Sequence, residues 1–176
     1  MSKAKDLATS AHNGQVRKSD GSPFMAHPIA VAKILEEYRF PPEVIAAALT
    51  HDVLEDTDVT EAQLRTALGD GVVDIVLGVT EVKSLPWEER KEKYIEAVVA
   101  GSEYVKAVSI ADKIHNAESF LQAYQEQGID LWQKFSRGPK KTLWFQRTLH
   151  DEVAKVWQHP LIDCYAQLVN QLEKLR

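Results

Sequence analysis

The sequence has one cysteine, no excess of positive charge and no long apolar run, and each of these absences excludes a class of protein. With Cys164 alone, the 176-residue chain cannot form an internal disulfide, which fits a reducing compartment. A formal net charge of −5 argues against broad electrostatic binding to nucleic acid or to an anionic membrane. No apolar run approaches the ~20 residues of a membrane-spanning helix, and residues 1–6 lack the apolar core of a signal peptide. We therefore expect a cytoplasmic protein without nucleic-acid or membrane partners.

Helical patterns dominate what is present. The length fits one domain, and no repeat, low-complexity tract or linker divides residues 1–176. Apolar residues recur at the spacing of helix faces, and glycine and proline residues separate the segments. The helices expected on this basis cover residues 3–12, a segment opening at 27–28, then 42 to about 56, 60–68, 70–79, 88–100, 105–123, 140–157 and 161–174. The fold class that we predict is all-α, a single-domain helical bundle of about eight to ten helices.

Two of these segments leave a β-strand open as an alternative. Residues 72–79 are rich in β-branched side chains, but their apolar positions favour a helix. Residues 105–111 form a largely apolar run, interrupted by Lys106 and Ser109, that would suit a buried strand, although the flanking pattern favours a buried helix.

The polar residues that follow apolar segments are the candidate functional site. His51 and Asp52 end an apolar run, and Glu55 and Asp56 follow one helical turn later. On one helix, His51 and Glu55 would share a face, with Asp52 and Asp56 beside them. A segment selected for stability alone rarely carries three carboxylates and an imidazole at such a position, so we interpret it as an active site.

His27 and Asp112 extend this site into a metal-binding set. Together with His51 and Asp52 they offer two imidazoles and two carboxylates, which suit Mn²⁺, Fe²⁺ or Zn²⁺ better than Ca²⁺. Taken singly, His27 could cap a helix and Asp112 could be a boundary charge. Their order along the chain is the stronger signal: a histidine, a His-Asp pair and a distant aspartate match the metal-dependent phosphohydrolases of the HD-domain type.

Longer stretches resemble the hydrolase domain of the RelA/SpoT homologues, in particular the stand-alone small alarmone hydrolases that include the metazoan-type SpoT homologue. The resemblance covers roughly residues 4–155. The stretches that carry it are His12-Asn-Gly-Gln15, Arg17-Lys18, Gly-Ser-Pro-Phe-Met-Ala-His27-Pro28, Ala-Leu-Thr-His51-Asp52-Val-Leu-Glu55-Asp56-Thr57 and Ala111-Asp112-Lys113-Ile-His-Asn116.

This resemblance implies an activity, a cofactor and a role for each matching residue. The activity is removal of the 3′-pyrophosphate from (p)ppGpp, which gives GDP or GTP and pyrophosphate, with Mn²⁺ as the usual ion and Fe²⁺ or Zn²⁺ as less usual ones. The implied metal ligands are His27, His51, Asp52 and Asp112, and the implied catalytic pair is Glu55 and Asp56. The implied substrate-binding residues are Arg17 and Lys18, for phosphate and base, and Asn116, for the nucleoside.

The remaining substrate contacts and the base are less well defined. Lys140 and Trp144, one helical turn apart, are the pair that we select as further substrate-binding residues. Phe24 stands where tyrosine is common in the family, and residues 83–95 and the C-terminal half diverge most. The alternatives are therefore a hydrolase of (p)ppApp or NADPH, or a regulator that binds an alarmone without cleaving it. The apolar residues of 161–174 leave a homodimer open.

Overall fold

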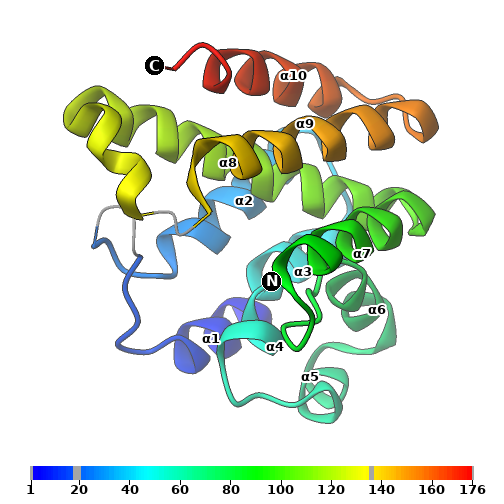
Figure 1. Cartoon of the computed structure of the whole chain (residues 1–176). Coiled ribbons are helices and arrows are strands. Elements are labelled where there is room, and N and C mark those ends of the chain that lie inside the picture. Colours follow the sequence, from blue (N-terminus) through cyan, green and yellow to red (C-terminus); the bar gives the residue numbers. More distant parts are fainter. Residues whose placement is uncertain (1, 18–20, 135–136, 176) are drawn as a thin grey trace.

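The structure, a computed structural model, describes residues 2–17, 21–134 and 137–175. Within these ranges it contains α-helices, one 3₁₀-helix (η1) and no β-strand (Figure 1). The helices are α1 (Ser2–Ala11), α2 (Ala26–Glu37), α3 (Pro42–Thr50), α4 (Val53–Asp56), α5 (Glu61–Leu68), α6 (Asp70–Gly78), α7 (Trp87–Ala100), α8 (Glu103–Gln127), η1 (Gly128–Lys134), α9 (Gly138–Val156) and α10 (Pro160–Leu172). The predicted all-α bundle is confirmed. None of the described helices is long and apolar enough to cross a membrane.

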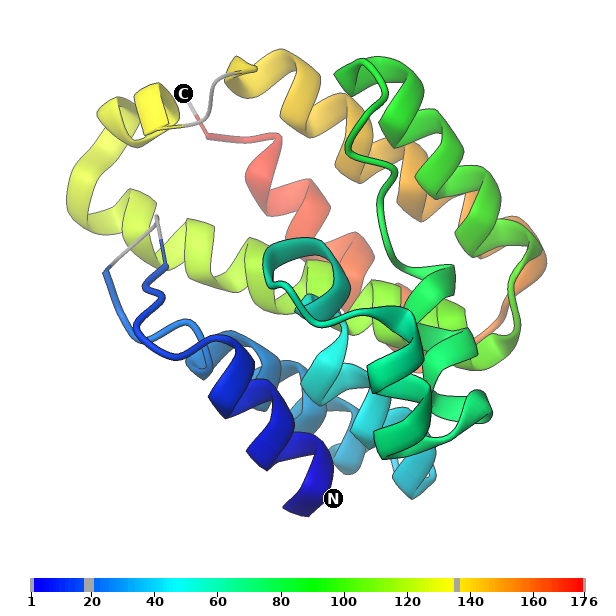
Figure 2. The same cartoon turned by 90° about the horizontal axis from the view of Figure 1, so that it is seen from below.

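Helix α8 is the element around which the others pack. Figures 1 and 2 show it crossing the molecule, and it contacts α2, α3, α6, α7 and α10. All residues from 105 to 112 are buried, and most of them are apolar; the buried Lys106 donates to the carbonyl of Gly101. The polar Ser109 is accommodated because its hydroxyl pairs with that of Tyr94 at 2.8 Å. The apolar run is therefore a core helix, and Asp112 at its end is buried within the bundle.

The helix expected from residue 42 to about 56 is in fact two helices. Helix α3 ends at Thr50 and α4 begins at Val53. The Thr50 hydroxyl donates to the carbonyl of Ala46 at 2.9 Å, and Nδ1 of His51 is 2.8 Å from the carbonyl of Ala48. These side-chain bonds compete with backbone N–H groups for the same carbonyl oxygens. The prediction of one continuous helix through His51 was therefore wrong.

Helices α5 and α6 begin with different kinds of cap. Thr60 caps α5 and forms a reciprocal pair of hydrogen bonds with Gln63. At the start of α6, Gly69 occupies the capping position with φ of 86°, a conformation that favours glycine. Asp70, the first residue of α6, pairs with Arg65 at 2.9 Å.

Candidate metal centre and catalytic turn

The four predicted metal ligands converge from three segments. His27 comes from α2, His51 and Asp52 from the turn between α3 and α4, and Asp112 from α8. Oδ1 of Asp112 lies 3.0 Å from Nε2 of His27 and 3.8 Å from Nε2 of His51. Oδ2 of Asp52 lies 3.3 Å from Nε2 of His51 and 3.9 Å from Nε2 of His27. Ligand atoms of His27, His51 and Asp112 all lie within 4.8 Å of one another, so one ion could contact the set.

The hydrogen bonding of His51 shows that the set suits a cation. Its Nδ1 donates to the carbonyl of Ala48, which leaves a lone pair on Nε2. The His51 side chain is only 4% exposed, and Nε2 has no hydrogen-bond partner within the described part of the chain. A buried lone pair beside the carboxylates of Asp52 and Asp112 is unfavourable unless a cation lies among them. The residues present therefore fit a divalent metal ion.

The carboxylates of the cluster attract positive charge, which either a proton on His51 or a metal ion can supply. Burial lowers the pKa of His51, but the carboxylates of Asp52 and Asp112 more than offset burial, and the pKa is raised overall. Burial favours protonation of Asp112, yet Lys113 and His27 hold the pKa of that carboxyl well below its usual range. Asp112 is thus ionised inside the protein, as a metal ligand must be.

Neighbouring side chains orient these ligands. Nζ of Lys113 lies 2.5 Å from Oδ2 of Asp112, and the amide of Asn116 donates to Oδ1 at 2.5 Å. Nδ1 of His115 lies 2.7 Å from Nδ1 of His27. Such contacts fix the orientation of a ligand and are a common feature of metal sites. The sequence patterns assign no role to Lys113 and His115, although both lie within the stretch that carries the family resemblance.

Glu55 and Asp56 sit on a turn that two loops hold in place. From the loop between α6 and α7, the backbone N–H of Glu81 donates to Oε1 of Glu55 at 2.7 Å. From the same loop, Nζ of Lys83 lies 2.6 Å from Oδ1 of Asp56. From the loop between α1 and α2, the amide of Gln15 donates to the backbone carbonyl of Asp56 at 2.9 Å. We call Glu55 and Asp56, with these surroundings, the catalytic turn, after the role that the sequence predicts for the pair.

The environment of Glu55 favours proton transfer. Burial raises the pKa of its carboxyl, and the N–H of Glu81 offsets this only in part. The charge of Asp52 raises the pKa further. A carboxyl whose pKa is shifted toward neutrality is a suitable proton acceptor at the pH of the cell.

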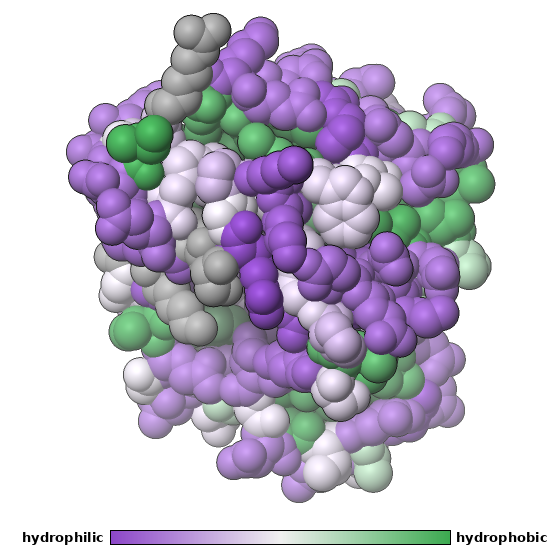
Figure 3. Space-filling model, viewed as in Figure 1, coloured by the Kyte–Doolittle hydropathy of each residue, from purple (hydrophilic) through white to green (hydrophobic). Residues whose placement is uncertain are grey.

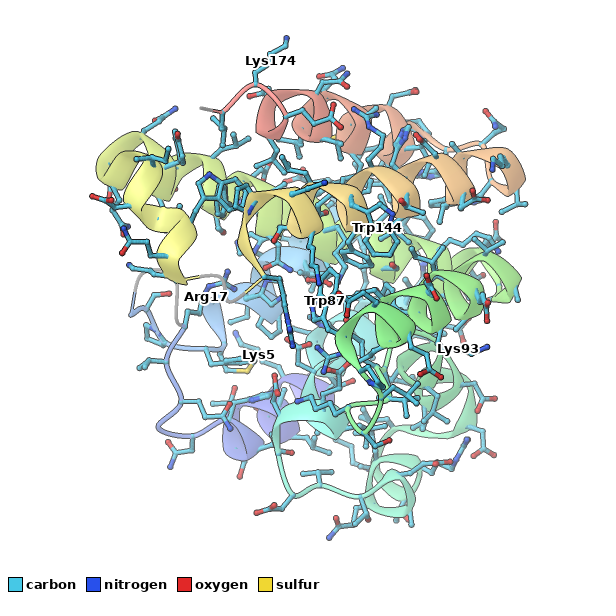
Figure 4. The ribbon with its side chains drawn as sticks, in the orientation of Figure 1. Lys5, Arg17, Trp87, Lys93, Trp144 and Lys174 are labelled. Atoms are coloured by element: carbon cyan, nitrogen blue, oxygen red, sulfur yellow. The ribbon has the colours of Figure 1, made fainter. Side chains whose placement is uncertain are left out.

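Two half-buried lysines and a pair of tryptophans lie beside this site. The ammonium groups of Lys91 and Lys113 lie 4.4 and 5.8 Å from the ring of Phe145. Lys91 also faces Trp87, and Trp87 contacts Trp144 with 6.1 Å between ring centroids. Figure 4 shows these tryptophans between α7 and α9. These contacts connect Asp112, through the two lysines and Phe145, to the two tryptophans.

The other predicted substrate-binding residues occupy less defined positions. Arg17, labelled in Figure 4, is half-buried, and its backbone N–H donates to the carbonyl of Ser22 at 2.8 Å. Lys18 lies outside the described residues. Lys140 is exposed in the first turn of α9, and Trp144 is 38% exposed. Figure 3 shows strongly hydrophilic side chains gathered near the centre of this face, beside less polar ones. The assigned roles of these residues stay predictions.

The chain is similar in sequence to a protein family and to several named proteins. A family model described as the HD domain matches residues 4–138. A Danio rerio protein named guanosine-3′,5′-bis(diphosphate) 3′-pyrophosphohydrolase MESH1 is 43% identical over 114 residues, which are 63% of this chain and 63% of that protein. A Haemophilus influenzae protein named guanosine-3′,5′-bis(diphosphate) 3′-pyrophosphohydrolase is 40% identical over 116 residues, 62% of this chain and 17% of that protein. The matches therefore span less than two thirds of either relative.

Solved structures agree with this placement. A Listeria monocytogenes protein, lmo0812, superposes with a TM-score of 0.79 at 38% identity, covering 84% of this chain and 99% of that one. A metazoan orthologue of SpoT that hydrolyses ppGpp and plays a role in starvation responses superposes with a TM-score of 0.75. It is 26% identical and covers 97% of this chain and 93% of its own.

Proposed function

Because the chain belongs to the HD domain family, we propose that it is a metal-dependent hydrolase that removes the 3′-pyrophosphate from (p)ppGpp. The observation that carries this proposal is the convergence of two histidines and two aspartates beside an acidic pair, in a chain whose relatives are named for that reaction. The products are GDP or GTP and pyrophosphate. The finer assignments below extend the proposal to residues.

We assign the metal to His27, His51, Asp52 and Asp112. Mixed nitrogen and oxygen donors favour Mn²⁺, with Fe²⁺ and Zn²⁺ as less favoured ions. When bound, such an ion supplies Lewis acidity toward a phosphoryl oxygen and lowers the pKa of a coordinated water.

We assign water orientation and proton transfer to the catalytic turn. Oε1 of Glu55 accepts the N–H of Glu81, so Oε2 is the atom that we assign to take the proton of the attacking water. Asp56 orients that water. Water attacks the phosphorus attached to the ribose 3′-oxygen, the bond between them breaks, and the 3′-oxygen leaves with a proton.

We assign the phosphates of the substrate to Lys91, Lys113 and Arg17. The side chain of Lys91 is only 14% exposed, and burial together with the nearby charge of Lys113 lowers its pKa. Lys91 pairs with Glu81 and Lys113 with Asp112, and each ammonium has further N–H groups that can donate to a phosphate oxygen. The site therefore attracts a polyphosphate although the chain as a whole carries a net negative charge. Asn116, Lys140, Trp144 and, beyond the described residues, Lys18 complete the predicted substrate contacts.

The test is product release from a nucleotide panel. Purified protein with Mn²⁺ is given ppGpp, pppGpp, ppApp and NADPH, and release of pyrophosphate or phosphate is measured for each. We expect pyrophosphate from ppGpp and pppGpp. Glu55→Gln and Asp56→Asn should lower kcat by about 10²- to 10⁴-fold, the range of acid–base catalysis.

Asp58→Asn is the matched control, because Asp58 is an exposed carboxylate two residues beyond the catalytic turn. Its kcat should equal that of the unmodified protein. If only ppApp or NADPH is cleaved, the proposed substrate is wrong but the proposed active site is retained. Tight ppGpp binding without turnover at any metal concentration would make the chain a regulator that binds alarmones.

Other assignments from the sequence stay predictions at this stage. We propose that residues 1–176 form one domain, supported by the packing of α10 on α8 and of α1 on α3. The cytoplasmic location, the homodimer and the lack of nucleic-acid partners are expectations from composition.

A further inference from the structure

Helix α4 cannot hold its own geometry. It has four residues, Val53–Asp56, so it consists of a single turn. The last carbonyl groups of any helix lack backbone partners within it, and in so short a helix this applies to nearly every carbonyl. The positions of the carboxyl groups of Glu55 and Asp56 therefore depend on contacts from elsewhere in the chain.

Lys83 supplies two of those contacts with one ammonium group. Its Nζ donates to the backbone carbonyl of Glu55 at 2.5 Å and to Oδ1 of Asp56 at 2.6 Å. The first bond satisfies a carbonyl at the C-terminal end of α4, where a positive charge is favourable. The second fixes one carboxylate oxygen of Asp56 relative to the helix backbone.

Lys83 is itself carried by an anchored loop. Glu81, two residues earlier, is bound through its carboxylate to Arg90 at 2.8 Å and to Lys91. The backbone N–H of Glu81 meets Glu55, and a turn brings the N–H of Leu85 to the carbonyl of Val82 at 3.1 Å. The loop between α6 and α7 is thus bound to α7 through Glu81 and to the catalytic turn through both Glu81 and Lys83.

The exposure of the pair indicates that it does not serve stability. The side chains of Lys83 and Asp56 are 49% and 39% exposed. An ion pair so open to solvent contributes little to the free energy of unfolding. Placement of a reacting group, in contrast, affects rate strongly, because a displacement of about 1 Å can lower it about 10²-fold.

We propose that Lys83 is a positioning residue that holds Asp56 and the Glu55 backbone in the geometry required for hydrolysis. This inference rests on the proposed hydrolase function. Lys83 acts through Asp56 and the Glu55 carbonyl, which both accept hydrogen bonds from its ammonium. Substitution should therefore change kcat rather than KM.

The experiment compares Lys83→Met, which keeps the length of the side chain but removes its charge, with Lys83→Arg, which keeps the charge. Lys93→Met is the matched control, since Lys93 is an exposed lysine of α7 that pairs with Glu96 and points away from the site in Figure 4. We expect Lys83→Met to lower kcat about 10- to 100-fold with KM unchanged. Lys83→Arg should recover most of the loss, and the melting temperature should change by less than about 4 °C.

A second measurement is independent of turnover. Backbone amide hydrogen exchange at Glu55 and Asp56 should be faster in Lys83→Met and unchanged in Lys93→Met. An increase in KM with constant kcat would show substrate binding instead and overturn the proposal. Unchanged exchange at the turn would overturn it as well. If the unmodified protein cleaves no nucleotide, the function proposed above fails, and the exchange measurement alone decides the role of Lys83.

Discussion

The side-chain amide of Gln15 donates a hydrogen bond to the backbone carbonyl of Asp56 at 2.9 Å, across 41 residues of sequence. The same side chain accepts a hydrogen bond from Nδ1 of His12 at 2.9 Å, and His12 is buried. Gln15, in the α1–α2 loop, therefore connects the end of α1 to the catalytic turn. Lys83 binds the same turn from the α6–α7 loop.

Replacing Gln15 with methionine should weaken both the fold and the catalytic turn. The buried N–H of His12 would lose its acceptor, which costs about 1–3 kcal/mol in the free energy of unfolding. The carbonyl of Asp56 would lose a donor, and we expect kcat to fall about 10-fold. Chemical denaturation and initial rates measure the two effects. Gln133→Met, at an exposed position on η1, should leave both within error, and equal behaviour of the two variants would refute the assignment.

Metal binding should stabilise the protein by a free energy that rises with the logarithm of the Mn²⁺ concentration above its Kd. Mn²⁺ at about 100 times its Kd adds about 2.7 kcal/mol, which corresponds to a melting temperature roughly 5–10 °C higher for a chain of this size. Asp52→Asn keeps the shape of a half-buried ligand but removes its charge, so the Mn²⁺-dependent shift should disappear. Asp58→Asn should retain it. A shift of equal size in Asp52→Asn would place the ion elsewhere.

The sequence predicted the helices and the metal-binding set because both depend on local or chemically distinctive patterns. Residues 105–111 belong to a helix that is buried on all sides. Because such a helix has no polar face, only the residues flanking the buried run distinguish it from a strand. His27, His51, Asp52 and Asp112 were predicted by residue type and order, which do not require knowledge of the packing.

The contacts around the catalytic turn could not be predicted in the same way. The N–H of Glu81 reaches Glu55 through its backbone, which any residue type would supply. Lys83 is one of many lysines, and its role depends on where a loop folds back on α4. The break between Thr50 and Val53 arises from side-chain bonds to carbonyls that helix propensity does not include.

Two glycines of α6 should respond in opposite ways to substitution by alanine. A Cβ on Gly78 would lie 2.6 Å from a methyl group of Val105, so Gly78→Ala should lower the free energy of unfolding by about 1–3 kcal/mol. A Cβ on Gly71 would find its nearest neighbour 3.8 Å away, so Gly71→Ala should raise it by up to ~1 kcal/mol. Chemical denaturation measures both.

The double substitution Gly78→Ala with Val105→Ala tests the cause of the first effect. Because Val105 supplies the clashing methyl group, the two changes should couple by at least ~0.5 kcal/mol relative to the sum of the single ones. Additive effects would show that Gly78 is required for its backbone conformation and not for space.

His159 should make stability depend on pH near the C-terminal helix. Its Nδ1 accepts the backbone N–H of Leu161 at 3.2 Å, which caps α10, and its ring stacks on Trp157 with 4.8 Å between centroids. Only the neutral imidazole can accept this bond, and a positive charge at a helix N-terminus is unfavourable. Burial lowers the pKa of His159, and the charge of Glu103 offsets this only in part.

The sign of the effect follows from that lowered pKa. Between the native pKa of His159 and the unfolded value of about 6.5, the unfolded chain binds more protons, so stability rises with pH in that window. The contribution is complete above the unfolded pKa and is lost as the pH falls below it toward the native value. His159→Asn keeps a capping side chain but does not titrate, so its free energy of unfolding is compared with that of the unmodified protein at pH 7.5 and 5.5. The free energy of unfolding of the asparagine variant, relative to that of the unmodified protein, should be about 0.5 kcal/mol higher at pH 5.5 than at pH 7.5. The effect is small because the imidazole is partly exposed. Other titrating groups cancel in this comparison, so a difference that does not change with pH would mean that the cap does not depend on a neutral imidazole.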